Sequence, residues 1–549
     1  MQLTVQADFT KLNSVKAILE SLTKSRGLEL SPPKPELDGL VKDLGLSIKS
    51  LKKAKTLLST HLQKGSDILV YGDYDADGIT ATAVLWQTLQ DLAKGSSARI
   101  LPFIPNRESH GYGLSATSLA DIFSQAAFKD SAYPDFSPAL IFTVDTGIVA
   151  NVEIETLVQR GIDVILTDHH QASDQLPPAT VVLHSIVTSG AGLAWVVALF
   201  LADAALAVYN LLALATIGIV ADLLPLTGLN RQLVTHGLKL LHKTHNPGLL
   251  SLLKLAGIEP STINTGHLNF ALAPRLNAAG RLGDATDALR LLVSQNSRQV
   301  TQLAQALNTQ NITRQALTEA GIKEALQQKP AHRLIIAASE EYHEGVIGLI
   351  AGKLAERWHR PALALSLKGD LVKGSARSVK GVDITSLLRR FSSLFSSVGG
   401  HELAAGFSLP RANLSELTKK ILEYADQEID ESLLVPHLTV DAELKLTQTS
   451  LTLAKALEQL APYGMGNPKP VFFTRNLTVL EDKALGTSGQ HRRLTLSDGQ
   501  ISREAIWFNA TGHVPEGRLT QLSELVYTLD INVWQNKEKL QLVVKAASV

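Results

Sequence analysis

No cysteine occurs among the 549 residues of this chain, and that absence excludes two kinds of chemistry. Disulfide bonds cannot form, and a metal ion cannot be held by thiolates. The lack of cysteine also fits a reducing compartment. The first eight residues lack the basic segment followed by an apolar run that marks a signal peptide. We therefore expect a cytoplasmic protein.

An excess of either charge is also missing, because Lys+Arg and Asp+Glu both number 52. The net charge therefore gives no support for a nucleic-acid partner, and any site for a polyanion must be a local basic patch. Residues 185–202 carry no charge and approach the length of a membrane span. The nearest basic residue downstream is Arg231, so the flanking positive charge of a span is missing. We predict a buried pair of helices there and no membrane contact.

Length and patterning predict several domains, because 549 residues exceed what one hydrophobic core supports. Short apolar runs at 67–72, 98–104, 139–144, 162–167 and 179–183 alternate with helical patterns, which is typical of βαβ units and a parallel sheet. Segment 294–328 contains one glycine and no proline, which predicts a long helix. Near the C-terminus one strand face is expected to carry Tyr527, Leu529, Ile531 and Val533. The predicted divisions are a helical extension over 1–64, an α/β domain over 65–293, a connecting helix over 294–330, a smaller α/β domain over 331–432 and a β-barrel over 437–549.

Acidic side chains follow several predicted strands. Asp73, Asp75 and Asp77 come directly after the first strand, and Asp145 and Asp168 follow the third and fourth. Because ligands bind at the carboxyl ends of parallel strands, we expect these carboxylates to converge. An acidic turn ending in glycine, or a helix N-cap at Asp145, is the alternative interpretation. A calcium loop of the EF-hand type is excluded, because its twelfth position is a valine.

A histidine pair accompanies the fourth of these strands, in Asp168-His169-His170. A polar loop is the alternative, but imidazole beside a carboxylate cluster points to a transition-metal-type ion. Adjacent histidines point in different directions, so one can bind metal while the other faces substrate. Asp222, after a further apolar run, is the weakest candidate ligand on sequence grounds. The pattern predicts a di-metal hydrolase.

An ordered series of motifs accompanies these residues. It lies at 71–78, 105–107, 111–114, 143–147, 168–170, 220–226, 274–281, 343–348, 374–378 and 399–406. With this series the chain resembles the DHH phosphoesterase superfamily and, within it, the RecJ family of 5′→3′ exonucleases specific for single strands. The resemblance implies an α/β fold in which a parallel-sheet DHH domain is joined by a long helix to a smaller DHHA1 domain and an OB-type barrel. The segment after His184 departs from the family pattern, because it is shortened and lacks an Asn-Pro pair.

The resemblance also implies a metal centre and a reaction. Two Mn²⁺ or Mg²⁺ ions would be held by Asp73, Asp75, Asp77, Asp145, His169 and Asp222. Asp145 would bridge them, Asp168 would support a ligand, and His170 would face the scissile phosphate. The implied reaction is two-metal hydrolysis of single-stranded DNA that releases 5′-mononucleotides in repair and recombination. A RecQ-type helicase and a single-strand-binding protein are the implied partners.

A second set of residues is expected to bind the nucleic acid. It comprises Asn106, Arg107, Arg281, His343, Ser375, Arg377, Gly399, Gly400 and His401. The arginines and the serine would grip the 5′-terminal phosphate, because guanidinium groups bind phosphate in a bidentate manner. Gly399-Gly400-His401 is expected to open a helix whose backbone N–H groups bind phosphate, with a plain turn as the alternative.

Two other functions share the same motifs. A DHH phosphodiesterase for short oligoribonucleotides or cyclic dinucleotides would share the metal centre, but such enzymes usually lack the barrel expected over 437–549. A catalytically inactive replication scaffold would have lost metal-binding carboxylates, whereas every motif position is filled here.

Overall fold

The computed structural model describes residues 2–327, 329–486, 489–510, 518–535 and 537–548. The chain divides into two compact units. The barrel unit comprises residues 1–34, 225–235 and 437–549, and the two-domain unit comprises residues 35–224 and 236–436.

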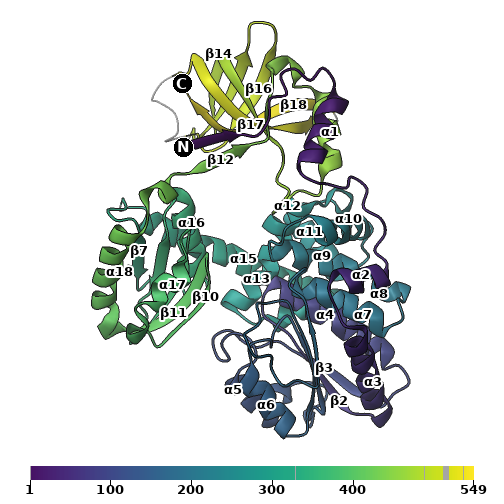
Figure 1. The fold of residues 1–549 in the computed structure, drawn as a ribbon. Helices are drawn as coiled ribbons and strands as arrows, with labels where there is room; N and C mark the ends of the chain where they lie inside the picture. The colour runs from purple at the N-terminus through teal and green to yellow at the C-terminus, as the bar shows by residue number, and fades with distance from the viewer. Residues whose placement is uncertain (1, 328, 487–488, 511–517, 536, 549) are drawn as a thin grey trace. The chain divides into compact units, whose positions relative to one another are not determined.

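A five-stranded parallel sheet forms the centre of the first α/β domain of the two-domain unit (Figure 1). Its strands are β2 (Asp67–Tyr71), β3 (Arg99–Phe103), β4 (Leu140–Val144), β5 (Asp163–Asp168) and β6 (Val181–His184). Their order is β3-β2-β4-β5-β6, and every neighbouring pair is parallel. The strands form because β-branched and other apolar side chains are buried on both faces. The predicted parallel sheet is confirmed, with each strand within about two residues of its expected position.

Helices cover both faces of this sheet. Helices α5 (Ala116–Phe123) and α6 (Asn151–Gln159) bury Leu119, Ile122, Ile154 and Leu157 against one face. Helices α3 (Ile48–Lys64), α4 (Ala76–Leu92) and α7 (Gly190–Leu201) lie on the opposite face (Figure 1). The domain is completed by α2 (Leu37–Asp43), α8 (Leu206–Asn210), α9 (Leu212–Ala221), α11 (Pro247–Ala256), α12 (Thr265–His267), a π-turn (Leu268–Leu272), α13 (Ala273–Leu282) and α14 (Thr286–Val293). The division between the two units falls within helix α10 (Gly228–Leu241).

The apolar segment 185–202 contains helix α7, which packs against α4 and α9. Trp195 is fully buried, and its indole N–H donates to the carbonyl of Val208 at 3.0 Å. Within the described residues, no helix combines the length and apolarity needed to cross a membrane. The segment is buried in protein, as predicted, but it forms one helix and not a pair; the second helix that is apolar on all sides, α9 (Leu212–Ala221), lies outside it.

The long helix predicted after residue 294 is α15 (Ser297–Ala325), which contacts α13 and also α16 of the second α/β domain. The sheet of that domain has the order β10-β11-β9-β8-β7, and only β7 and β8 are parallel. Its strands are β7 (Ile335–Ser339), β8 (Ala362–Ser366), β9 (Leu371–Arg377), β10 (Ser397–His401) and β11 (Ala404–Pro410). Its helices are α16 (Ile347–Trp358), α17 (Ile384–Arg389) and α18 (Leu414–Glu428).

The barrel unit contains a closed five-stranded barrel, as the strand alternation predicts. Its strands are β14 (Val471–Leu485), β15 (His491–Ser497), β16 (Ser502–Trp507), β17 (Gln521–Trp534) and β18 (Lys537–Ser548), and it is flanked by β12 (His437–Val440), β13 (Ala442–Glu443) and α19 (Leu451–Leu457). The predicted inward face of β17 is confirmed at Tyr527 and Leu529, which are buried, whereas Val533 is exposed.

The N-terminal segment contributes to this same unit. Strand β1 (Gln2–Val5) pairs in parallel with β12, and helix α1 (Val15–Ser25) buries Ile18 and Leu22 in the barrel core. The sequence pattern predicts only short helices in this region, so the strand was missed. A four-residue strand pairing with residues more than 400 positions away leaves little local signal.

Candidate metal centre and substrate cavity

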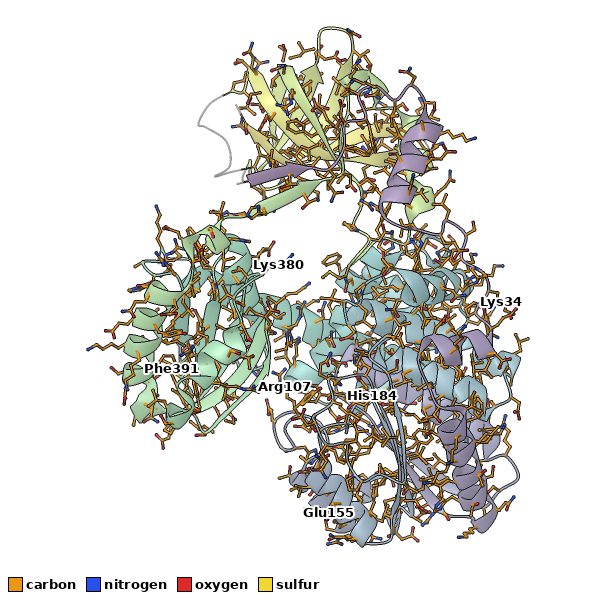
Figure 2. The ribbon with its side chains drawn as sticks, in the orientation of Figure 1. Lys34, Arg107, Glu155, His184, Lys380 and Phe391 are labelled. Atoms are coloured by element: carbon orange, nitrogen blue, oxygen red, sulfur yellow. The ribbon has the colours of Figure 1, made fainter. Side chains whose placement is uncertain are left out.

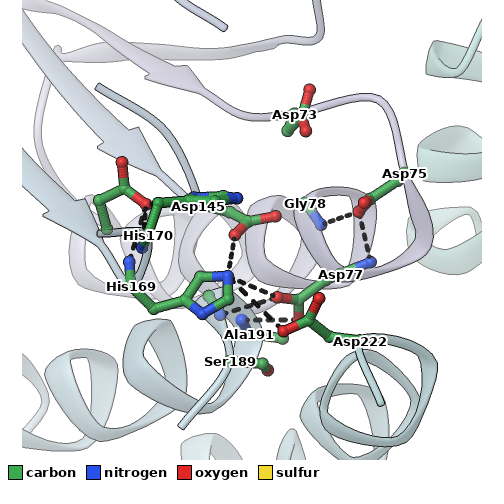
Figure 3. A network of polar contacts seen from close by, with 12 residues as sticks. Asp73, Asp75, Asp77, Gly78, Asp145, His169, His170, Ser189, Ala191 and Asp222 are labelled. Atoms are coloured by element: carbon green, nitrogen blue, oxygen red, sulfur yellow. Dashed lines mark hydrogen bonds and ion pairs between the residues drawn. The ribbon is translucent and has the colours of Figure 1, made fainter. Parts of the chain in front are cut away.

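The predicted carboxylates converge at the carboxyl edge of the parallel sheet, where Figure 3 shows His169 pointing between Asp145 on one side and Asp77 and Asp222 on the other. His169 Nε2 lies 3.0 Å from Asp145 Oδ1, 3.6 Å from Asp77 Oδ2 and 3.8 Å from Asp222 Oδ2. Asp222, at the C-terminal end of α9, therefore belongs to the same cluster. Its signal in the sequence is the weakest of the set.

Asp75 and Asn277 hold the loop that follows β2. Asp75 is the N-cap of α4, and its Oδ1 accepts hydrogen bonds from the N–H groups of Asp77 and Gly78 at 2.9 and 3.0 Å. The amide of Asn277 on α13 also holds this loop, because its Oδ1 accepts from Ala76 N at 2.7 Å. The start of α4 is thus held by Asp75 from within the loop and by Asn277 from α13.

Asp145 does not have the helix N-cap role that was its alternative interpretation. Helix α6 begins six residues later, with Ala150 at the N-cap position. Asp145 instead has a φ of 60°, a strained conformation for a residue with a side chain, and is almost fully buried. This backbone directs the carboxylate into the cluster.

The N-terminus of α7 approaches the cluster closely. The N–H groups of Gly190 and Ala191 donate to Asp77 at 2.7 and 3.0 Å. A Cβ at Gly190 would lie 2.3 Å from Asp145 Oδ1, and one at Gly218 of α9 would lie 2.3 Å from Asp77 Oδ1. Both positions therefore need glycine. The shortened segment after His184, which is labelled in Figure 2, leads directly into this helix.

The donor set fits divalent ions. Three groups of side chains bring ligand atoms within 4.8 Å of one another: Asp73, Asp75 and Asp145; Asp77, His169 and Asp222; and Asp145, His169 and His170. Among the described residues, the Oδ1 atom of Asp145 is buried and receives no hydrogen bond. A buried carboxylate oxygen without a donor costs free energy unless a cation satisfies it. Oxygen ligands with one imidazole suit Mn²⁺ or Mg²⁺.

The carboxylates destabilise one another in the absence of a cation. Burial and the charge of Asp75 raise the pKa of Asp73 to about 8. Burial and the charge of Asp77 raise the pKa of Asp222 to about 8. Burial, reinforced by Asp77, also raises the pKa of Asp145 well above its ordinary value. All these groups can be ionised at neutral pH only when positive charge lies among them.

Asp168 and His170 form a separate hydrogen-bonded pair beside the cluster. His170 Nδ1 lies 2.7 Å from Asp168 Oδ1, and Asp168 also accepts from the N–H groups of Ile148 and His169. Burial alone would raise the pKa of Asp168, but the hydrogen bonds, led by the one from His170, lower it. Burial would lower the pKa of His170, yet Asp168 outweighs that effect and raises it to about 9.

Tyr112 contacts His170 as well, and it was not among the site residues predicted from the sequence. Its hydroxyl lies 2.9 Å from His170 Nε2, so both ring nitrogens of His170 have partners. Its position in the motif at 111–114 was the available signal. A histidine with both nitrogens engaged is better suited to acting beside the ions than to binding one.

The two-domain unit also contains a cavity of about 580 Å³, called the arginine cavity below. Its lining includes Arg107, Arg281, His343, Gly345, Ser375 and Lys373. Arg281 donates to the carbonyl of Gly345 at 3.0 Å, and Arg377 donates to Ser375 Oγ at 3.1 Å. The predicted phosphate-binding arginines and serine are therefore brought together from both α/β domains.

Cations are crowded around this cavity. Burial lowers the pKa of Arg281 to about 10, and the nearby charges of Arg107, Arg314 and Arg377 act in the same direction. Burial also lowers the pKa of Arg377. Like charges held this close repel one another, and an anion would relieve the repulsion.

One predicted substrate segment has a different structure. The expected helix opening at Gly399-Gly400-His401 is wrong, because these residues belong to strand β10 and pair antiparallel with Ala404–Gly406 of β11. Their backbone groups lie in a strand ladder, where they cannot form the anion site of a helix N-terminus. Among the described residues that line the arginine cavity, none comes from this segment.

Asn106 is not among the described residues that line the arginine cavity, although its neighbour Arg107 is. Its Oδ1 accepts from the N–H groups of Glu108 and Ser109 at 2.9 and 3.2 Å, which shapes the loop that carries Arg107. Asn106 lines a different cavity of about 460 Å³, next to His110 and Trp86. Its observed contacts are those of a residue that positions the loop.

Three family models match the chain. The DHH family, N-terminal domain, matches residues 67–227; the DHHA1 domain matches residues 331–429; and the RecJ OB domain matches residues 440–546.

Curated relatives carry the name single-stranded-DNA-specific exonuclease RecJ. The protein from Dickeya dadantii is 31% identical over 97% of this chain and 96% of its own length. The protein from Bacillus subtilis is 34% identical over 91% of this chain, which spans 64% of that relative. Among solved structures, RecJ from Thermus thermophilus in complex with Mn²⁺ matches with a TM-score of 0.83 and 28% identity, covering 100% of this chain and 79% of that chain. A structure of the same protein with Mg²⁺ matches with a TM-score of 0.77 and 27% identity, covering 100% of this chain and 78% of that chain.

Proposed function

Because the chain belongs to the RecJ family, we propose that it is a single-strand-specific DNA exonuclease that works from the 5′ end and releases 5′-mononucleotides. The observation that carries this proposal is the cluster of five carboxylates around His169. A cavity rich in arginine in the same compact unit provides a site for a terminal phosphate.

The metal-binding role is proposed for Asp73, Asp75, Asp77, Asp145, His169 and Asp222, with Asp145 shared between two ions, either Mn²⁺ or Mg²⁺. When bound, two such ions supply an activated water at neutral pH and neutralise charge on a phosphate. Asp77 is oriented for this role by the N–H groups at the start of α7. Asp145 is oriented by its strained backbone.

The chain's own groups position the scissile phosphate. Asp168 holds the imidazole of His170 through Nδ1, and this hydrogen bond favours the protonated form by raising the pKa of His170 against the effect of burial. A protonated His170 places a positive charge beside the cluster, where it attracts a phosphate oxygen. Tyr112 fixes the ring from the other side.

The arginine cavity is proposed to hold the 5′-terminal phosphate. Arg107, Arg281, Ser375 and Arg377 provide the donors, and guanidinium groups suit the geometry of phosphate oxygens. Fixing the end of the strand there sets which internucleotide bond reaches the metal centre. His343, whose Nδ1 accepts from Gly345 N at 3.0 Å, shapes the wall of the cavity.

The barrel is proposed to bind single-stranded DNA. Phe473 and Trp507 are buried in the barrel unit, whereas Phe508 and Trp534 are 55% and 73% exposed and are available to stack on bases. A stacking contact contributes about 1–3 kcal/mol per base without reading sequence. Binding should therefore tolerate any sequence and weaken as salt rises.

Two features oppose the alternative functions. An inactive scaffold would not require the carboxylates to converge with mutually raised pKa values. A phosphodiesterase restricted to dinucleotides would not require the barrel, which the RecJ OB domain matches. The wider proposal is a cytoplasmic enzyme of DNA repair and recombination that acts with a RecQ-type helicase and a single-strand-binding protein.

The experiment that tests the proposed function uses single strands labelled at either end, incubated with the full chain and Mn²⁺. We expect the 5′ label to be released at once as a mononucleotide, while the 3′ label stays in long products. EDTA should stop the reaction. Rapid release of the 3′ label, or activity confined to dinucleotides, would contradict the proposal.

A further inference from the structure

The arginine cavity extends beyond the residues proposed to hold a terminal phosphate. Its volume of about 580 Å³ lies within the range of pockets that hold whole small molecules. A single phosphate group fills only part of such a space. The remaining wall includes Lys368, Lys373, Gly406 and Phe407.

Strand β9 places Lys373, Ser375 and Arg377 at alternate positions. Side chains at alternate positions of a strand lie on the same face. Residues i and i+2 are separated by about 6.6–6.8 Å along the strand. Lys373 therefore lies on the same face of β9 as Ser375 and Arg377 and adds a second cation to that face. Within the described residues, Lys373 forms no ion pair, and it is half-buried.

The lining of the cavity is positively charged. Arg107, Arg281, Lys368 and Lys373 line it, against Glu108 and Glu344, and Arg377 adjoins it through Ser375. Glu108 and Glu344 are exposed, as are Arg107 and Lys368, whereas Lys373 is half-buried. A ligand with several negative charges in a row would match the row of cations on β9.

We propose that this cavity accepts a 5′ end that carries a chain of two or three phosphates, with Lys373 and Lys368 contacting the phosphates beyond the first. The proposal rests on the exonuclease function proposed above. The first phosphate occupies the site formed by Ser375, Arg377, Arg107 and Arg281, so the nucleic acid keeps the same register as a strand with a 5′-monophosphate.

The reaction on such a strand is the same hydrolysis. Water adds to the phosphorus between the first and second nucleotides, and the bond from that phosphorus to the 3′-oxygen of the first nucleotide breaks. The 3′-oxygen takes a proton, and the shortened strand keeps a 5′-monophosphate. The first product is therefore a nucleoside 5′-triphosphate, and all later products are monophosphates.

The test compares three synthetic single strands of one sequence, ending in 5′-hydroxyl, 5′-monophosphate or 5′-triphosphate. We expect the full chain with Mn²⁺ to degrade the triphosphate strand at a rate similar to the monophosphate strand. Chromatography should identify the first product as the nucleoside triphosphate. In Lys373→Gln, the ratio of kcat/KM for the triphosphate strand to that for the monophosphate strand should fall about tenfold, the loss expected for one charge-assisted hydrogen bond.

Two further lysine variants serve as a comparison and a control for Lys373→Gln. Lys368→Gln, at an exposed position that tolerates substitution, should lower the same ratio by a smaller factor. Lys380→Gln is the matched control, because Lys380 is an exposed lysine of the same domain outside the cavity (Figure 2). It should leave the ratio unchanged.

The outcomes separate this inference from the proposed function. Degradation of the monophosphate strand with no degradation of the triphosphate strand would overturn the inference alone. Release of pyrophosphate in place of the nucleoside triphosphate would also overturn it, as would an unchanged ratio in Lys373→Gln. Failure to degrade all three strands would contradict the exonuclease function itself.

Discussion

Replacement of Asp145 by asparagine separates the metal role from a structural role, because the two side chains have nearly the same volume. Asp145 belongs to two of the three groups of ligand atoms, so both are affected. We expect Asp145→Asn to abolish most of the exonuclease activity while the chain stays folded. The reason is that Asp145 Oδ1 is buried without a hydrogen bond and lies beside the proposed ligand His169, where a cation would satisfy it.

The size of the loss follows from the geometry. Asp145 offers a ligand atom to two groups, and removing one preorganised electrostatic group from an active site typically costs about 2.7–4 kcal/mol of transition-state stabilisation. Removing one carboxylate charge from a divalent ion therefore lowers kcat/KM by roughly 10²–10³. The metal-free variant should be no less stable than the parent, because the substitution relieves repulsion among buried carboxylates.

The assay measures kcat/KM on a 5′-phosphorylated single strand and the melting temperature with and without Mn²⁺. For the parent, Mn²⁺ at about 100 times its Kd adds about 2.7 kcal/mol per site, and the variant should lose most of this gain. Asp203→Asn is the control, because Asp203 is an exposed carboxylate that pairs with Lys55. Activity of Asp145→Asn within a few-fold of the parent would refute the reasoning.

Three other predictions address the surroundings of the metal centre. Gly190→Ala should remove the stabilisation by Mn²⁺ in thermal melts, because its Cβ would lie 2.3 Å from the Oδ1 atom of Asp145. The control is Gly39→Ala, which should retain this stabilisation because a Cβ there meets nothing within 4 Å. Tyr112→Phe should lower kcat about fivefold, the equivalent of one hydrogen bond of about 1 kcal/mol to His170, and should leave Mn²⁺ affinity measured by calorimetry unchanged. In EDTA, the melting temperature of the parent relative to that of Asp222→Asn should fall as pH rises from about 4 to about 8, because the pKa of Asp222 is raised to about 8 and its native carboxyl group binds more protons than the unfolded one across this interval. A relative melting temperature that rises over the same interval would contradict the raised pKa.

The parallel sheet and the metal cluster were predictable from the sequence because their signals are local. Each strand is a short apolar run; Asp145 directly follows β4, Asp73 follows β2 after one residue, and Asp168 is the last residue of β5. The rule that ligands gather at the carboxyl ends of parallel strands then brings these residues together without knowledge of the tertiary structure. Asp222 has a weaker signal, because it lies at the end of a helix.

The errors arose where tertiary pairing determines local structure. The pair Gly399-Gly400 is compatible with a helix start, a turn or a strand, and the register with Ala404–Gly406 selects the strand. Strand β1 exists only because β12 pairs with it. The contact of Tyr112 with His170 joins residues 58 positions apart, and no spacing rule predicts such a contact.

Two divalent ions are proposed to lie among side chains from the segments that follow β2, β4 and β5, from the first turn of α4 and from the end of α9. Anomalous diffraction at the manganese edge, from a crystal of the full chain soaked in Mn²⁺, measures this directly. We expect two strong peaks, one beside Asp77, His169 and Asp222 and the other beside Asp73 and Asp75, with Asp145 contacting both. The absence of anomalous density at these carboxylates, in a crystal that shows manganese elsewhere or none at all, would contradict the account.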